Sequence, residues 1–194
     1  SMADIDCVYK VADHIERELS NGKLVAVVVS AMAGETDRLI GLADQVGNIE
    51  LQSERDVIIS SGEQVSSAIL SMTLNKRNIP ARSIQGWQIP LITNSMHGSA
   101  RISDIKSSHL EKLMEKGIVP IIAGFQGISE ENRVTTLGRG GSDTTAVAIA
   151  CSIDADLCDI YTDVDGVYTS DPRIIPDAQK LKLVSFEEML EMAS

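Results

Sequence analysis

Basic residues, aromatic residues and cysteines are all scarce in this chain of 194 residues. Lysines and arginines number 17 against 28 aspartates and glutamates, so the formal net charge is −11. Nucleic acids and anionic membrane surfaces are polyanions that attract basic proteins, so we expect neither as a partner. An anionic small molecule would have to be held by local positive groups, backbone amides or a divalent cation.

The three cysteines, Cys7, Cys151 and Cys158, are odd in number and form no Cys-x-x-Cys motif. Two of them lie in apolar runs, where a thiol usually acts as a small core side chain. No stretch approaches the roughly 20 apolar residues of a membrane helix, and the first residues lack the pattern of a signal peptide. We therefore expect a soluble protein in the reducing cytoplasm.

The common catalytic and metal-binding patterns are also missing. His14 and His109 are expected on the surfaces of amphipathic helices, and His97 lies in an irregular loop that suggests no partner. No group of residues has the spacing of metal ligands, and no nucleophile is paired with a base. The sequence therefore predicts no protein-built metal site.

Short apolar runs alternate with segments of helical periodicity, which predicts one α/β domain. Its sheet is expected to be mostly parallel and covered by helices on both faces, with ligands at the carboxyl ends of the strands. Buried strands are predicted at residues 24–29, 118–123 and 157–161. Helices are predicted at residues 5–19, 35–46, 60–77, 105–116 and 142–153.

Two segments interrupt the alternation and are candidate lids or hairpins. Residues 81–101 are irregular, and residues 125–136 form a polar excursion from a strand. A last helix predicted at residues 185–193 stops at the chain end without a cap, which indicates an interrupted domain.

The turn from Gly138 to Asp143 reads Gly-Arg-Gly-Gly-Ser-Asp and opens an apolar helix. Its glycines let the backbone approach a ligand, and the helix start offers free amides and a positive dipole end. A tight connection would explain the glycines but not the neighbouring charges: Arg139 can grip a carboxylate, and Asp143 can accept from an ammonium group. Neither a Walker loop nor the dinucleotide fingerprint fits, so we predict a general site for phosphate or carboxylate.

Residues 162–173 follow the strand predicted at residues 157–161. This loop offers hydroxyls, carboxylates, an aromatic ring and an arginine to a nucleotide, although a surface turn explains the spacing equally well. An EF-hand is excluded, because its first ligand position would be Tyr161.

Two other loops run from apolar segments into helices. Residues 30–36 leave the first strand through small residues, and residues 60–64 follow the apolar residues 57–59 in the same way. Glu63 would then stand in the first turn of a helix. It is either a carboxylate that stabilises the helix dipole or the partner of an ammonium-bearing substrate.

Long runs of the sequence resemble the signatures of aspartokinases, and other amino-acid kinases, such as acetylglutamate and uridylate kinases, would share the architecture without these strings. The resemblance implies the amino-acid kinase fold, a three-layer α/β/α sandwich with a mostly parallel central sheet. It also implies transfer of the γ-phosphoryl group of ATP to the side-chain carboxylate of aspartate, toward lysine, methionine and threonine. The matching runs are residues 30–32, 124–127, 135–143, 161–173 and 185–189.

The resemblance also implies roles for individual residues. Arg139 would hold the α-carboxylate of aspartate, Glu63 its ammonium group, and Asp143 would orient the substrate and a catalytic lysine. Because a carboxylate is already a nucleophile, no general base is required. Mg²⁺ would bridge the phosphates of ATP. The implied substrate-binding residues are Thr36, Glu63, Arg139, Gly140, Gly141 and Ser142, with Arg139 and Asp143 catalytic. The implied nucleotide-binding residues are Ser30, Thr162, Asp163, Tyr168, Thr169, Ser170, Asp171, Pro172 and Arg173.

The sequence departs from the aspartokinase pattern at both ends. The family begins with the loop Lys-Phe/Tyr-Gly-Gly-Thr-Ser, whose lysine neutralises the transferred group, and ends with two regulatory ACT domains; neither is present. We expect residues 1–194 to form a partial catalytic domain, incomplete at both ends, from an enzyme that is a homo-oligomer at full length. Loss of one preorganised charge typically slows catalysis about 100- to 1000-fold, so we expect little or no activity and no feedback regulation by lysine or threonine.

Two alternatives stay open at this point. The chain could be a non-catalytic ligand-binding or assembly subunit that has kept the pockets and lost the lysine loop. Within the enzyme class it could be another amino-acid kinase, which competition between aspartate and glutamate derivatives would separate.

Overall fold

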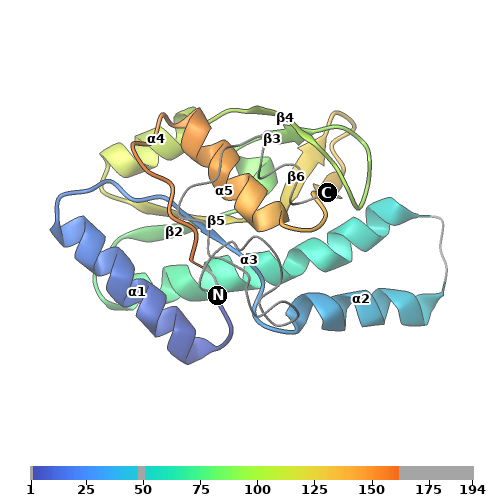
Figure 1. Cartoon of the computed structure of the whole chain (residues 1–194), viewed down its shortest axis with the longest axis horizontal. Coiled ribbons are helices and arrows are strands. Elements are labelled where there is room, and N and C mark those ends of the chain that lie inside the picture. The colour runs from blue at the N-terminus through green and yellow to red at the C-terminus, as the bar shows by residue number, and fades with distance from the viewer. Residues whose placement is uncertain (1, 48–50, 162–194) are drawn as a thin grey trace, which may run out of the picture. The chain divides into compact units, whose positions relative to one another are not determined.

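The computed structural model describes residues 2–47 and 51–161 (Figure 1). Five helices and seven strands lie in these ranges, with a single 3-10 turn at Gly86–Gln88. The helices are α1 (Ile5–Ser20), α2 (Glu35–Val46), α3 (Gln52–Lys76), α4 (Ser108–Glu115) and α5 (Gly141–Ser152). The strands are β1 (Val27–Val29), β2 (Ala81–Ile84), β3 (Leu91–Thr93), β4 (Ile102–Ile105), β5 (Val119–Ala123), β6 (Gln126–Ser129) and β7 (Val134–Thr136).

The first of two sheets is parallel throughout and has the strand order β1-β5-β2. Its central strand β5 is buried along its whole length, which explains its unbroken apolar sequence. The second sheet has the order β4-β3-β6-β7 and is mixed, with β3 parallel to β6. The chain passes from β5 in the first sheet to β6 in the second through residues 124 and 125.

Helices cover both faces of the parallel sheet, because alternate residues of each strand point to opposite faces. Val27 and Val29 pack with α1 and α3 in one hydrophobic cluster, whereas Val28 packs with α4 and α5 in another. Figure 1 shows α1 and α3 on one side of these strands and α4 and α5 on the other. The predicted three-layer α/β/α architecture is therefore confirmed.

The segment predicted as a loop that runs from apolar residues into a helix proves to be the interior of a helix. α3 begins at Gln52, so residues 57–59 are helical and Glu63 lies in the middle of the helix rather than in its first turn. Val57, Ile58 and Ile59 are β-branched residues, which have a low preference for helices, and they suggested an apolar segment before the helix. The 25-residue length of α3 and its packing against other elements outweigh this local preference.

The strand predicted at residues 157–161 is not formed. Leu157, Ile160 and Tyr161 are all exposed, and no described strand pairs with the segment. A short apolar run resembles a strand in sequence, but a strand requires a hydrogen-bonded neighbour. Cys151 and Cys158 are also exposed, the first on α5 and the second in this segment, so neither is the core side chain that the apolar runs indicated.

Two hairpins lie at the edges of the second sheet, and the two irregular segments contribute to them. β3 and β4 pair across residues 94–101, and β6 and β7 pair across residues 130–133. Residues 125–136 are therefore a hairpin, one of the two alternatives predicted. Residues 81–101 are a hairpin only in part, because they also contain β2 of the parallel sheet and the hairpin strand β4 lies beyond them. No helix in the described ranges is both long enough and apolar enough to cross a membrane.

Candidate active site

A cleft of about 290 Å³ opens where β1 and β5 end and α2 and α5 begin. Because β1 and β5 are parallel, the loops after them lie at the same edge of the sheet, as expected for a ligand site in this architecture. The lining residues are Ser30, Thr36, Glu63, Phe125, Gly138, Gly140, Gly141, Ser142 and Asp143.

The glycine-rich turn forms one wall of this cleft. Gly138 and Gly140 have φ angles of 81° and 66°, in the left-handed region that glycine enters without strain. α5 then begins at Gly141, and its capping residue Gly140 has no side chain to bond the first amides. The amide groups at a helix start lack partners within the helix. The amide of Gly141 donates to the carbonyl of Gly138 at 3.1 Å, which leaves the amides of Ser142 and Asp143 for a ligand. This wall therefore offers backbone donors and the positive end of a dipole to an anion.

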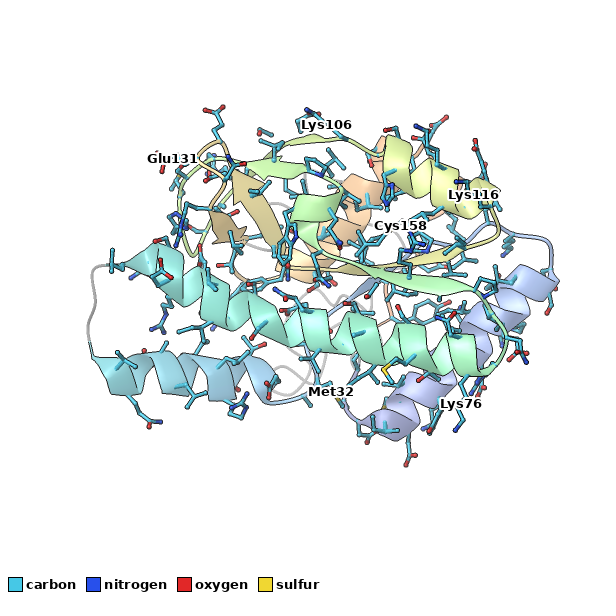
Figure 2. All side chains as sticks on the ribbon, turned by 180° about the vertical axis from the view of Figure 1, so that it is seen from behind. Met32, Lys76, Lys106, Lys116, Glu131 and Cys158 are labelled. Carbon is cyan, nitrogen blue, oxygen red and sulfur yellow. The ribbon has the colours of Figure 1, made fainter. Side chains whose placement is uncertain are left out.

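Glu63 of α3 forms another part of the cleft lining and is almost fully buried, at 4% exposure. Its Oε1 accepts a hydrogen bond of 3.1 Å from the amide of Ala31, in the loop after β1. A Cβ atom on Gly62 would lie only 2.9 Å from Cβ of Ala31, so glycine is what lets α3 approach this loop. Figure 2 labels Met32, which marks the same loop beside the middle of α3.

The second oxygen of Glu63 is left without a partner. Oε2 is buried and accepts no hydrogen bond from any residue that the structure describes. Burial raises the pKa of Glu63 to about 7, against which the hydrogen bonds from backbone amides act only weakly. A buried carboxylate oxygen without a donor is costly, so a cationic group entering the cleft would be strongly favoured beside it.

Phe125 is a cleft residue that sequence reasoning did not select. It follows the carboxyl end of β5 and has a φ angle of 66°, which is unusual for a residue with a side chain. Its amide donates to Oγ1 of Thr145 in α5, at 3.1 Å. Its position after a buried strand and the presence of only two phenylalanines in the chain were the available signals.

Asp56, also on α3, is a second buried carboxylate that the sequence did not reveal. It is 1% exposed, and its oxygens accept hydrogen bonds from Nδ1 of His97, from the amide of Gly98 and from both the amide and the hydroxyl of Thr136. A carboxylate can only accept, so Nδ1 of His97 carries the proton. His97, for which the sequence suggested no partner, is therefore part of a buried polar network.

Seven of the predicted site residues line the cleft together: Ser30, Thr36, Glu63, Gly140, Gly141, Ser142 and Asp143. Arg139 is different, because its side chain is exposed and does not line the cleft. The predicted nucleotide-binding residues Thr162, Asp163, Tyr168, Thr169, Ser170, Asp171, Pro172 and Arg173 lie outside the described residues. Within residues 2–47 and 51–161, no group of three His, Cys, Asp or Glu side chains could hold a metal ion.

Comparison with known proteins identifies the family of this chain. The model of the amino acid kinase family matches residues 1–194, which is the whole sequence. The chain belongs to the amino acid kinase family. The cleft at the ends of β1 and β5 is therefore the candidate active site of an amino acid kinase family member.

Relatives within the amino acid kinase family are similar over the whole of this chain. An aspartokinase of Pseudomonas aeruginosa is 50% identical over 194 residues, covering 100% of this chain and 47% of that protein. The crystal structure of aspartate kinase from Synechocystis matches with a TM-score of 0.81 at 43% identity, covering 100% of this chain and 32% of that one. The crystal structure of E. coli aspartokinase III in complex with aspartate and ADP matches with a TM-score of 0.83 at 27% identity. The match covers 100% of this chain and 54% of that one. The chain spans about half the length of the curated relatives that it matches.

Proposed function

We propose that this chain is part of the catalytic domain of an aspartate kinase, which transfers the γ-phosphoryl group of ATP to the side-chain carboxylate of aspartate. The observation that carries the proposal is the unpartnered buried Oε2 of Glu63, in the same cleft as the start of α5. One wall therefore attracts a cation and the other an anion. An amino acid presents both groups on one carbon atom.

Glu63 would bind the ammonium group of aspartate, which supplies the donor that Oε2 lacks. The start of α5, with Gly140, Gly141 and Ser142, would bind the α-carboxylate. Arg139, on the same turn, would rotate inward when the substrate binds and add a bidentate contact. Thr36 would add a hydroxyl at the start of α2.

The nucleotide would be bound by Ser30 at the edge of the cleft and by the loop of residues 162–173. In the transfer, an oxygen of the aspartate side chain forms a bond to the γ-phosphorus. The bond from that phosphorus to its bridging oxygen breaks, and ADP leaves. The aspartate carboxylate needs no general base, so catalysis consists of positioning and charge neutralisation.

Mg²⁺ would neutralise negative charge on the phosphates. Asp143 and Glu63 are the only carboxylates among the described residues that line the cleft. Two carboxylates are too few to enclose the ion, so its other ligands would be phosphate oxygens and water molecules. Asp143 would orient the substrate at the beginning of α5. A cytoplasmic location, a homo-oligomeric full-length enzyme and the division into a partial catalytic domain stay predictions.

A non-catalytic ligand-binding or assembly subunit is the second candidate. None of the described residues that line the cleft is a lysine or an arginine. Transfer of a phosphoryl group requires positive charge around the transferred oxygens, so the cleft as described would bind an amino acid better than it would catalyse transfer.

Trapping of the acyl phosphate by hydroxylamine tests the proposal. The protein encoded by the complete gene would be incubated with ATP, Mg²⁺ and either aspartate or glutamate, and the hydroxamate would be measured. We expect product with aspartate only. No hydroxamate together with calorimetric binding of aspartate would favour the non-catalytic candidate, and absence of both would reject the assignment of the cleft.

A further inference from the structure

Asp56 and Glu63 lie seven residues apart on α3, which is close to two helical turns. They therefore face the same way, separated by about 10 Å along the helix axis at 1.5 Å per residue. Gln126, from the start of β6, also contacts this part of α3: its side-chain Nε2 donates to the backbone carbonyl of Ser60, which lies between the two carboxylates, at 2.9 Å. A single rigid element thus carries both buried carboxylates.

Asp56 binds the two segments that support the glycine-rich turn. Thr136 is the last residue of β7, and the turn at Gly138 begins two residues later. The hydroxyl of Thr136 donates to the carboxylate of Asp56 at 2.7 Å, and the backbone amide of Thr136 donates to the same carboxylate at 3.2 Å. The position of Thr136 relative to α3 is therefore fixed by two hydrogen bonds to one carboxylate.

The second segment is the loop between β3 and β4. His97 donates to Asp56 at 2.7 Å, and the amide of Gly98 donates to both carboxylate oxygens, at 3.1 and 3.2 Å. A Cβ atom on Gly138 would lie 3.3 Å from the carbonyl oxygen of Gly98, so the turn packs directly on this loop. Asp56 therefore restrains the turn both along the chain, through Thr136, and through the loop packed against it.

We propose that Asp56 is a positioning residue that holds the glycine-rich turn at a fixed distance from Glu63. The inference rests on the proposed function, in which Glu63 binds the ammonium group on the α-carbon of aspartate and the glycine-rich turn binds the carboxylate on the same carbon. Asp56 touches no substrate itself. It sets the spacing of the cleft walls through α3, and a small displacement of a binding group weakens binding and catalysis strongly.

Two substitutions and a matched control test the role of Asp56 by steady-state kinetics. Asp56→Asn removes the charge, and Thr136→Val removes one hydroxyl donor to it. Thr135→Val is the control, because the neighbouring buried hydroxyl bonds Thr93 at 2.6 Å and not Asp56. We expect the KM for aspartate to rise about tenfold in the first two, which is the change that ~1.4 kcal/mol produces. The KM for ATP should stay within about twofold, and Thr135→Val should change neither constant.

Hydrogen–deuterium exchange gives a readout that is independent of activity. In the 194-residue chain without ligand, amides of residues 137–143 should exchange about tenfold faster in Asp56→Asn and Thr136→Val than in Thr135→Val, while β5 stays protected. If Asp56→Asn does not fold, Thr136→Val decides.

An unchanged KM for aspartate in an active variant, or unchanged exchange at residues 137–143, overturns the proposal. A wild-type protein without aspartate-dependent activity rejects the proposed function instead, and the exchange result then decides the positioning role alone.

Discussion

The amino-terminal part of α3 and its middle each bury one carboxylate, and the two are treated in opposite ways. Asp56 is 1% exposed and accepts from four donor groups, whereas Glu63 is 4% exposed and accepts one hydrogen bond from the loop after β1. A fold bears the cost of an unpaired buried oxygen mainly where a ligand supplies the partner. The comparison separates a carboxylate that holds the structure from one that awaits a substrate.

Substitution of Glu63 by glutamine is expected to have the largest effect on function. Glutamine keeps the shape of the side chain but loses the charge that would pair with the substrate ammonium. We expect kcat/KM for aspartate to fall about 100-fold or more, because loss of one partner of a buried charge pair costs about 2–5 kcal/mol. The measurement is the hydroxamate assay on the protein from the complete gene. A fall smaller than about threefold would remove Glu63 from the substrate site.

Substitution of Asp56 by alanine is expected to have the largest effect on stability. Four donors lose their acceptor in a buried site, so the free energy of unfolding should fall by about 3 kcal/mol. Urea denaturation measures it, and Glu63→Gln at pH 8 provides the comparison. The unfolding free energy of Glu63→Gln should equal or exceed that of the wild type at this pH, because the substitution breaks no fully satisfied hydrogen-bond network. Similar losses in both variants would break the contrast between the two carboxylates.

The pH dependence of stability should differ between the wild type and Glu63→Gln. The pKa of Glu63 is raised by burial to about 7 in the folded chain, from 4.5. The folded state therefore binds more protons than the unfolded state between these values, so the unfolding free energy falls as pH rises from about 4.5 to about 7. The full change attributable to Glu63 is about 3 kcal/mol. Denaturation at several pH values measures the difference between the two proteins, and parallel curves would contradict the unpaired burial of Glu63.

Substitution of Glu54, the third carboxylate on α3, is expected to have the smallest effect on stability and serves as the exposed control for the two buried carboxylates. The side chain of Glu54 is 58% exposed and forms an ion pair with Arg133, whose side chain is 41% exposed. Exposed pairs of this kind contribute little, so Glu54→Gln should lower the unfolding free energy by less than about 0.5 kcal/mol. The same denaturation series measures it. A loss comparable to that of Asp56→Ala would show that burial does not explain the comparison.

The cleft was more predictable than the network that supports it. Ser30 and Thr36 could be expected at the site from the sequence, because they follow a strand of the parallel sheet and ligands bind at the carboxyl ends of such strands. Ser142 follows β7 of the second sheet, and the glycine-rich turn and the resemblance selected it instead. Asp56 could not, because its partners lie 41 to 80 residues away and a carboxylate that directly follows Glu54 and Arg55 suggests a surface position. Glu63 was selected, but its place in mid-helix was missed because residues 57–59 resemble a strand.

The left-handed backbone of Phe125 has a consequence for engineering the protein. A residue with a side chain in that region is strained by about 1–3 kcal/mol, so a search for stabilising substitutions would favour glycine or asparagine there. The aromatic ring that lines the cleft would then be lost. Position 125 is thus a point where thermostability and activity oppose each other, and a thermostable variant is better built on surfaces remote from the ends of β1 and β5.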